Sequence, residues 1–431
     1  LQMIAHILAR VEAGDAKPTL VVCPASLVYN WTAELERFAP SLDVCAIVDA
    51  KAQRRVQIAG VAEHNVVVTS YDLMRRDIDE YAEQDFARVV LDEAQYIKNP
   101  LTQVACAAKR LPAGVRFALT GTPIENRLSE LWSIFDFLMP GLLGTRESFA
   151  KRFESPVEHA EGDSAARLQS LVSPFVLRRV KEDVVADLPE KIEDTVMAQL
   201  TGEQRKLYLA NQDRIAQQVQ HREASEFKKD KLKVLAELTK LRQICCDPHL
   251  HYEDYKAGSA KLDACMELVH GALDGGHHIL LFSQFTGMLD IIGKRLAKED
   301  VGFLKLTGAS SKESRAKMVA QFQAGEVPVF LISLKAGGVG LNLTAADVVI
   351  HYDPWWNVAA QDQATDRAHR IGQQHTVTVY KLIAKDTIEE RIMQMQESKR
   401  DLVNSVLGGD GISSALFTRE DVLALLGGDG R

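Results

Sequence analysis

The sequence of 431 residues is too long for one compact core and suits two domains. Hydrophobic residues make up 46% of it, but no apolar run reaches the ~20 residues of a membrane span, so we expect no membrane partner. A net charge of -8 argues against binding nucleic acid through bulk electrostatics, so any such contact must be local. The six cysteines form no Cys-x-x-Cys pair, which argues against a disulfide framework and against a zinc site.

Short β-branched runs alternate with helical segments in the first part of the chain. Each run has apolar residues on both faces, which is typical of a buried strand, and the predicted strands are 19–23, 44–48, 66–69, 88–91 and 116–119. Ser26 precedes the helix that runs to about Phe38, and we expect its hydroxyl to cap that helix. Strands alternating with helices predict a parallel sheet that is covered on both sides.

The pattern becomes mostly helical from about residue 141 to residue 259, and the alternation then resumes. The later predicted strands are 278–282, 303–306, 327–332, 347–350 and 376–383. One helix is predicted from Asn357 to Arg370, and a closing helix from Thr387 to about Leu407. The predicted fold class is therefore α/β, with two parallel-sheet lobes joined by a helical region. The predicted domains are a first lobe at 1–140, a helical insertion or linker at 141–259, a second lobe at 260–410 and a tail at 411–431.

Two acidic residues, Asp92 and Glu93, end the apolar run Val89-Val90-Leu91. A carboxylate pair at the end of a buried strand is costly unless it meets a cation. We therefore expect both acids at a magnesium site, with Asp92 binding the ion and Glu93 activating a water molecule. The dipeptide Asp-Glu also occurs in exposed turns that bind no metal.

Two arginines lie three residues apart in the predicted helix near the C-terminal end. On a helix, the guanidinium groups of Arg367 and Arg370 would project from one face. Each planar group matches phosphate oxygens, so the pair suits the charge that develops during phosphoryl transfer. The alternative is a solvated helix with two surface ion pairs.

Several short sequence segments, taken together, resemble the motifs of the superfamily-two helicase-like ATPases. The segment from Gln363 to Gln373 is similar to the last motif of the SWI/SNF-type branch, and Asp92 to Gln95 resembles its Walker B motif. Leu119-Thr-Gly-Thr-Pro123 resembles the third motif, and the segments 175–184 and 241–248 resemble stretches peculiar to that branch. The matches follow the family order over nearly the whole chain. In fourth place the family usually has histidine or another residue, and Gln95 departs mildly from that pattern, which puts in doubt only the fine coupling between lobes.

This resemblance implies two RecA-like lobes that hydrolyse ATP with Mg²⁺ and move along double-stranded DNA. The implied catalytic residues are Glu93, Arg367 and Arg370, and the implied ATP contacts are Asp92, Gly340, Gln363, Arg367 and Arg370. The implied DNA contacts are Ser26, Thr69, Ser70, Thr120, Gly121, Ser283, Lys335, Gly337, Gly338 and Trp356.

The partners implied are double-stranded DNA and, as a candidate, a protein complex bound to it. The implied activity is a DNA-dependent ATPase that works as a translocase or remodeller. Two alternatives stay open: a strand-separating helicase or restriction-type translocase, and a non-catalytic DNA-binding scaffold. The expected location is cytoplasmic, at the nucleoid, in a prokaryote and nuclear in a eukaryote.

The P-loop string Gly-x-x-x-x-Gly-Lys-Ser/Thr occurs nowhere in these residues. In the family, the residues that follow Gly-Lys-Thr resemble Leu1 to Ala5. We therefore expect the sequence to start just after the P-loop and the first lobe to lack the strand that leads into it. We also expect these residues alone to be poorly stable and to hydrolyse little ATP. DNA-stimulated hydrolysis at family-like rates by the isolated chain would contradict this expectation.

Overall fold

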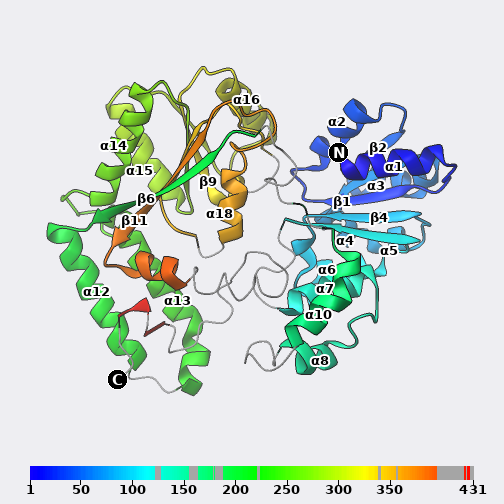
Figure 1. Cartoon of the computed structure of the whole chain (residues 1–431), viewed down its shortest axis with the longest axis horizontal. Helices are drawn as coiled ribbons and strands as arrows, with labels where there is room; N and C mark the ends of the chain where they lie inside the picture. The colour runs from blue at the N-terminus through cyan, green and yellow to red at the C-terminus, as the bar shows by residue number, and fades with distance from the viewer. Residues whose placement is uncertain are drawn as a thin grey trace. The chain divides into compact units, whose positions relative to one another are not determined.

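The computed structural model describes residues 1–121, 128–154, 164–177, 179, 188–220, 224–337, 341–355, 358–395, 422–423 and 425–427. The described residues up to 177 form one compact unit, the first lobe, and those from 179 onward form a second, the second lobe (Figure 1). Each lobe is an α/β unit with its own sheet and its own hydrophobic core.

The first lobe is built on a five-stranded sheet with the order β2-β3-β1-β4-β5. Its strands are β1 (Thr19–Cys23), β2 (Val44–Ile47), β3 (Val66–Ser70), β4 (Arg88–Asp92) and β5 (Val115–Leu119). All of them run parallel, and Cys23 pairs with Ser70 while Asp92 pairs with Leu119. Their carboxyl ends therefore meet at one edge of the sheet. The five predicted strands and the parallel sheet are confirmed.

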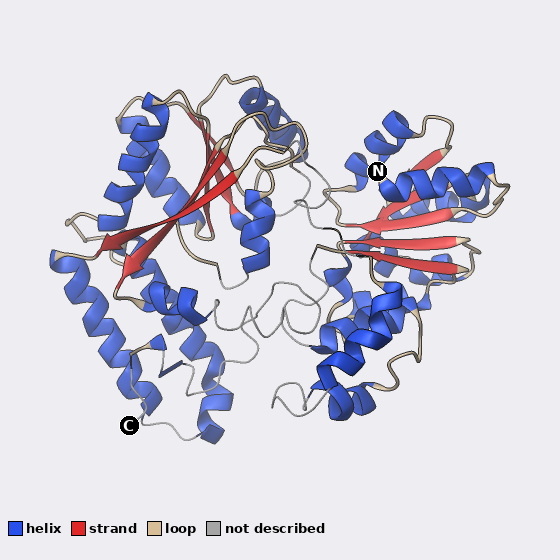
Figure 2. Cartoon of the chain, in the orientation of Figure 1, coloured by secondary structure: helices blue, strands red, loops and turns tan. Residues whose placement is uncertain are grey.

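Helices cover both faces of this sheet (Figure 2). They are α1 (Gln2–Glu12), α2 (Val28–Phe38), α3 (Lys51–Ala59), α4 (Tyr71–Arg76), α5 (Ile78–Ala82), α6 (Gln103–Arg110) and α7 (Leu128–Leu138). The prediction that Ser26 caps α2 was wrong, because the N-cap residue is Leu27 and no side chain caps that helix. The strands β1, β3 and β4 are buried almost throughout, whereas β5 is partly exposed along its length.

A smaller core lies beside the sheet of the first lobe. The helices around it are α7, α8 (Arg146–Phe149), the π-helical turn η3 (Ala150–Glu154) and α10 (Ser164–Val172). Leu168 and Val172 of α10 are both fully buried in this core. Because residues four apart share one face of a helix, this pair anchors α10 and turns its other face outward.

The second lobe has a six-stranded parallel sheet with the order β6-β11-β10-β7-β9-β8. The strands are β6 (Lys191–Gln199), β7 (Ile279–Ser283), β8 (Phe303–Leu306), β9 (Val329–Ser333), β10 (Val348–His351) and β11 (Val377–Lys385). Five of these were predicted, but β6 was not, because its segment lies in the part expected to be helical. It is a half-exposed edge strand that pairs with β11 along nine residues.

The helices of the second lobe include a long pair from the middle of the chain. They are α12 (Gly202–Gln220), α13 (Ala224–Cys246), α14 (Ala260–Asp274), α15 (Thr286–Lys298), α16 (Lys312–Gln323), α17 (Leu334–Gly337), α18 (Val358–Thr365) and a helix at 388–395. The single helix predicted up to Arg370 was wrong, because α18 ends at Thr365 and turns follow. Among the described residues, no helix has the length and apolar character needed to cross a membrane.

Candidate active site

Asp92 is the last residue of β4 and lies at the carboxyl edge of the first sheet. Its Oδ2 accepts a hydrogen bond of 2.8 Å from Trp31 Nε1, and its Oδ1 accepts one of 3.0 Å from the Glu93 backbone N-H. Burial raises the pKa of Asp92 above its ordinary value, while these two hydrogen bonds favour the carboxylate and oppose the rise. The carboxylate is thus held in one orientation at the sheet edge.

Glu93 turns the chain sharply away from the sheet. Its backbone is left-handed, with φ 53° and ψ 54°, which is uncommon for a residue other than glycine. Gln95 Nε2 donates a hydrogen bond of 2.7 Å to Glu93 Oε2, and Thr120 Oγ1 donates one of 2.9 Å to Gln95 Oε1. Gln95 therefore connects the acid after β4 to the residue after β5.

In a version of the protein that includes a P-loop, replacing Gln95 by leucine is expected to lower kcat for ATP hydrolysis by about tenfold to a hundredfold, because Glu93 loses a donor that orients it. The affinity for ATP should change little. Steady-state kinetics of Gln95→Leu, of Thr120→Val and of the double variant check this. Since both changes break one chain of hydrogen bonds, their effects should not add. Gln53→Leu, at an exposed position on α3, is the matched control and should behave as wild type.

Two aromatic residues support the acid pair, and sequence reasoning did not connect them with it. Trp31 lies on α2 after β1, and Tyr71 begins α4 directly after β3. Tyr71 Oη donates a hydrogen bond of 2.8 Å to the Asp92 carbonyl and its ring stacks on Tyr96, with the centroids 4.8 Å apart. The sequence did offer one signal for this role. Trp31 follows β1 and Tyr71 follows β3, and both are aromatic residues that can donate a hydrogen bond.

The hydroxyl groups of the last two residues of β3 are used inside the first lobe. Thr69 is fully buried and its Oγ1 donates to the Ile47 carbonyl at 3.0 Å. Ser70 is 3% exposed, and its Oγ caps α4 by accepting from the Leu73 N-H at 3.4 Å. The structure therefore gives both side chains internal partners, and their DNA contacts stay a prediction.

The remaining predicted DNA contacts of the first lobe lie nearer the surface. Ser26 is exposed in the turn before α2, and Gly121 is exposed after β5 with open space where a side chain would stand. Thr120 is half-buried beside Gln95. The structure thus brings Thr120 together with the acid pair.

In the second lobe, Arg367 and Arg370 lie in the turns that follow α18. Arg367 is 3% exposed and Arg370 is half-buried, with its Nε donating to the Asp366 carbonyl at 2.9 Å. Gln373 Nε2 holds these turns by donating to the carbonyls of Ala346 at 2.7 Å and Ala368 at 3.1 Å. The two arginines therefore do not share one helix face as predicted, because α18 ends at Thr365 and the backbone then forms turns, with the Arg367 N-H donating to the Ala364 carbonyl at 3.1 Å.

Ser283 at the end of β7 is buried in a polar network. Its Oγ donates to Asp353 Oδ1 at 2.5 Å, and the Gln284 N-H donates to the same carboxylate. Arg242 of α13 is 1% exposed and donates to Gln284 Oε1 at 3.1 Å and to the Pro354 carbonyl. The network fixes the loop after β10 against the end of β7, so the Ser283 hydroxyl is used internally and its DNA contact stays a prediction.

The other predicted residues of the second lobe are placed only in part. Gln363 lies half-buried on α18, and Lys335 and Gly337 lie in α17. Gly338, Gly340 and Trp356 lie outside the described residues.

His351 links the end of β10 to the end of α18. Its Nε2 lies 2.7 Å from Thr365 Oγ1, and its ring stacks on Phe282 with the centroids 5.5 Å apart. Burial, with a smaller effect from Lys381, lowers its pKa from 6.5 to about 3. The neutral ring is therefore part of the folded state.

The lowered pKa of His351 predicts how the free energy of unfolding changes with pH. The contribution of the neutral ring is present above the unfolded pKa of 6.5 and is lost as the pH falls toward about 3, since the unfolded chain binds the proton first. We expect urea denaturation to show a larger loss of stability between pH 7 and pH 4.5 in wild type than in His351→Asn. Equal losses in the two proteins would contradict the assignment.

The acid pair fits a magnesium ion. Among the described residues no group of three or more His, Cys, Asp or Glu side chains could hold a metal. Mg²⁺ is commonly bound through one or two carboxylates together with water and substrate phosphates, so a site with Asp92 and Glu93 needs no third carboxylate and stays a prediction.

Two parallel α/β lobes, one with an acid pair after a buried strand and one with a paired-arginine motif, define the class of two-lobed helicase-like ATPases. Residues 1–250 match the SNF2-related domain, and residues 260–372 match the helicase conserved C-terminal domain. The chain belongs to the SNF2-related family, and its two parallel sheets are the RecA-like lobes of that family.

Several curated proteins and solved structures are similar to this chain. It is 39% identical over 410 residues to an uncharacterized ATP-dependent helicase of Mycoplasma pneumoniae, a match that covers 95% of this chain and 39% of the relative. The putative ATP-dependent helicase/translocase YwqA of Bacillus subtilis is 40% identical over 433 residues, with coverage of 97% and 46%. The TATA-binding protein-associated factor MOT1 of Saccharomyces cerevisiae is 32% identical over 478 residues, with coverage of 97% and 26%. The chain thus spans less than half the length of these relatives.

Among solved structures, the SWI2/SNF2 ATPase core of Sulfolobus solfataricus in complex with dsDNA is 36% identical. That match covers 94% of this chain and 86% of the other, with a TM-score of 0.45.

Proposed function

We propose that the chain is the motor core of an ATP-dependent translocase that acts on double-stranded DNA. The observation that carries the proposal is the hydrogen-bonded constellation of Asp92, Glu93, Gln95 and Thr120 in a chain of the SNF2-related family. In this proposal the constellation offers one carboxylate to a cation and a second to water, which is what hydrolysis of a triphosphate needs.

Each polar residue then has a role in ATP hydrolysis. Asp92, oriented by Trp31, is the proposed ligand of Mg²⁺, and a bound Mg²⁺ supplies charge neutralisation at the phosphate oxygens. Glu93 holds and polarises the attacking water, and Gln95 keeps its carboxylate in place. Arg367 and Arg370 stabilise the negative charge of the transferring phosphoryl group.

Double-stranded DNA is the proposed track, and a DNA-bound protein is the proposed target. One relative is named as a helicase/translocase, and a solved relative is described in complex with dsDNA. Another is named as a factor associated with the TATA-binding protein, which supports a target bound to DNA. The proposed location follows the DNA, at the nucleoid of a prokaryote or in the nucleus of a eukaryote.

The test is displacement of a third DNA strand from a triplex, measured on a version of the protein that includes a P-loop. We expect ATP-dependent displacement, with no separation of the two strands of a plain duplex carrying a labelled strand. Because relatives are named helicases, strand separation is the second candidate, and release of the labelled strand would establish it. DNA binding with neither ATP hydrolysis nor displacement would establish a scaffold instead.

A further inference from the structure

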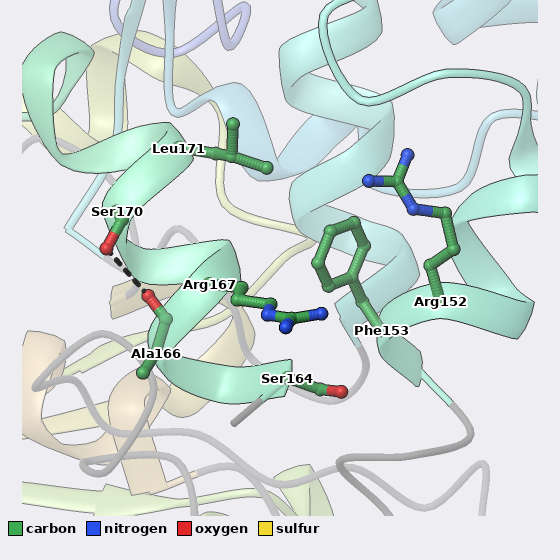
Figure 3. Close-up of a pocket in the computed structure, with 7 residues that line it drawn as sticks. All are labelled: Arg152, Phe153, Ser164, Ala166, Arg167, Ser170 and Leu171. Atoms are coloured by element: carbon green, nitrogen blue, oxygen red, sulfur yellow. Dashed lines mark hydrogen bonds between the residues drawn. The ribbon is translucent and has the colours of Figure 1, made fainter. Parts of the chain in front are cut away.

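A pocket of about 540 Å³ opens on the first lobe beside the small core, away from the acid pair in the sequence. It lies between η3 and α10, and its lining residues are Arg152, Phe153, Ser164, Ala166, Arg167, Ser170 and Leu171. Figure 3 shows the arginines arising from different elements, Arg152 beside Phe153 of η3 and Arg167 from α10. We call it the Arg152–Arg167 pocket.

Both arginines of the pocket keep their charge available. Each is exposed, and within the described part of the chain neither guanidinium group makes an ion pair or a hydrogen bond with another group. Arg152 contacts only a ring face, with its Cζ 5.1 Å from the centroid of Phe153. In a protein of net charge -8, two unpaired cations lining one concave site form a local anion-binding feature.

The rest of the pocket wall is mixed, with two serines, Ser164 and Ser170, beside the apolar Phe153, Ala166 and Leu171. Phe153 is buried at 3% exposure, whereas Leu171 is 38% exposed within the pocket. Leu171 lies four residues after Arg167, so both share a face of α10 next to the one that carries its anchor. Phe175, which follows the end of α10, is 53% exposed. An exposed apolar side chain thus lies beside the cationic group of Arg167 within the pocket.

We propose that the Arg152–Arg167 pocket binds an acidic peptide segment of a protein partner that carries an aliphatic or aromatic side chain next to its carboxylates. The volume is within the usual range for ligand sites and far exceeds what a single phosphate or carboxylate needs. Carboxylates pair with the two guanidinium groups, and the neighbouring apolar side chain covers Leu171. A DNA backbone fits less well, because its phosphates carry no apolar side chain to cover Leu171.

The test is fluorescence anisotropy with the full chain and a blocked peptide, Asp-Leu-Asp-Phe-Glu-Asp, that carries fluorescein. We expect saturable binding that weakens with salt and drops by about tenfold or more in Arg152→Gln/Arg167→Gln. The matched control is Arg37→Gln/Arg76→Gln, which removes the same charge from exposed positions of the same lobe and should bind as wild type. Peptides with serine in place of the acids, or of Leu and Phe, should also bind more weakly.

Three results would overturn the proposal. The first is equal affinity of the pocket variant and wild type at an unchanged melting temperature. The second is displacement of the peptide by inorganic phosphate at equal concentration, which would mark a plain anion site. The third is a pocket variant that loses affinity for duplex DNA and not for the peptide. The assay uses neither ATP hydrolysis nor movement on DNA, so its failure is separate from a failure of the proposed translocase function.

Discussion

Replacing Glu93 by glutamine is expected to lower kcat for DNA-stimulated ATP hydrolysis by about a hundredfold or more, in a version of the protein that includes a P-loop. The amide has nearly the shape of the carboxylate and keeps an oxygen that can accept from Gln95 Nε2, so the local geometry is retained. It cannot take the proton of the attacking water, however. ATP affinity should therefore persist while turnover is lost, and single-turnover kinetics with a nucleotide-binding assay measure the two separately.

The control for Glu93→Gln is Glu83→Gln, which removes one carboxylate from an exposed position of the same lobe. It should leave turnover unchanged. Asp92→Asn is expected to show a different pattern, in which more Mg²⁺ is needed for half-maximal activity, because that side chain is the proposed metal ligand. A Glu93→Gln protein that turns over ATP at close to the wild-type rate would contradict the assigned role.

The fold could be predicted from the sequence wherever burial dictates composition. The strand β3 is covered on both faces and begins with three valines, which are β-branched and apolar, so the strand is visible in the sequence. β6 contains Lys191, Glu193 and Asp194 because it is a half-exposed edge strand, and this composition hides it. What assigns it to the sheet is its pairing with β11, nearly two hundred residues away in the chain.

The candidate site could be predicted only in part, for a related reason. Asp92 and Glu93 were identified because a local pattern, an apolar strand ending in two acids, reveals them. Trp31 and Tyr71 support them through strand order, since β1 pairs with both β3 and β4, and strand order cannot be deduced from local pattern. The spacing of Arg367 and Arg370 suits a helix, but the chain forms turns there, and Gln373 is bonded to Ala346 and Ala368.

The largest stability effect is expected at an ion pair that is fully enclosed in the second lobe. Lys261 Nζ and Glu389 Oε2 are 2.5 Å apart, and both side chains are 0% exposed. The same carboxylate oxygen accepts from the Ala384 N-H at 2.9 Å, and the ammonium group lies 5.3 Å from the centroid of the Tyr352 ring. The pair therefore joins α14 and the helix at 388–395 to the loop after β10, and each charge depends chiefly on its partner to offset the loss of water around it.

Lys261→Met is expected to reduce the free energy of unfolding by about 3–5 kcal/mol, because it leaves Glu389 charged and buried without a cation. Lys261→Met/Glu389→Gln should recover part of this loss, since the amide is neutral and keeps an acceptor for the Ala384 N-H.

The matched control is the pair Lys305–Asp290, which has the same 2.5 Å separation but side chains that are 40% and 51% exposed. Lys305→Met should cost at most about 1 kcal/mol, because water screens an exposed pair and replaces the lost partner. Urea denaturation measures the free energy of unfolding of both lysine variants. Hydrogen exchange of β7 and β10 measures the stability of the second lobe locally. Equal costs for the two lysines would mean that separation, and not burial, sets the strength of these ion pairs.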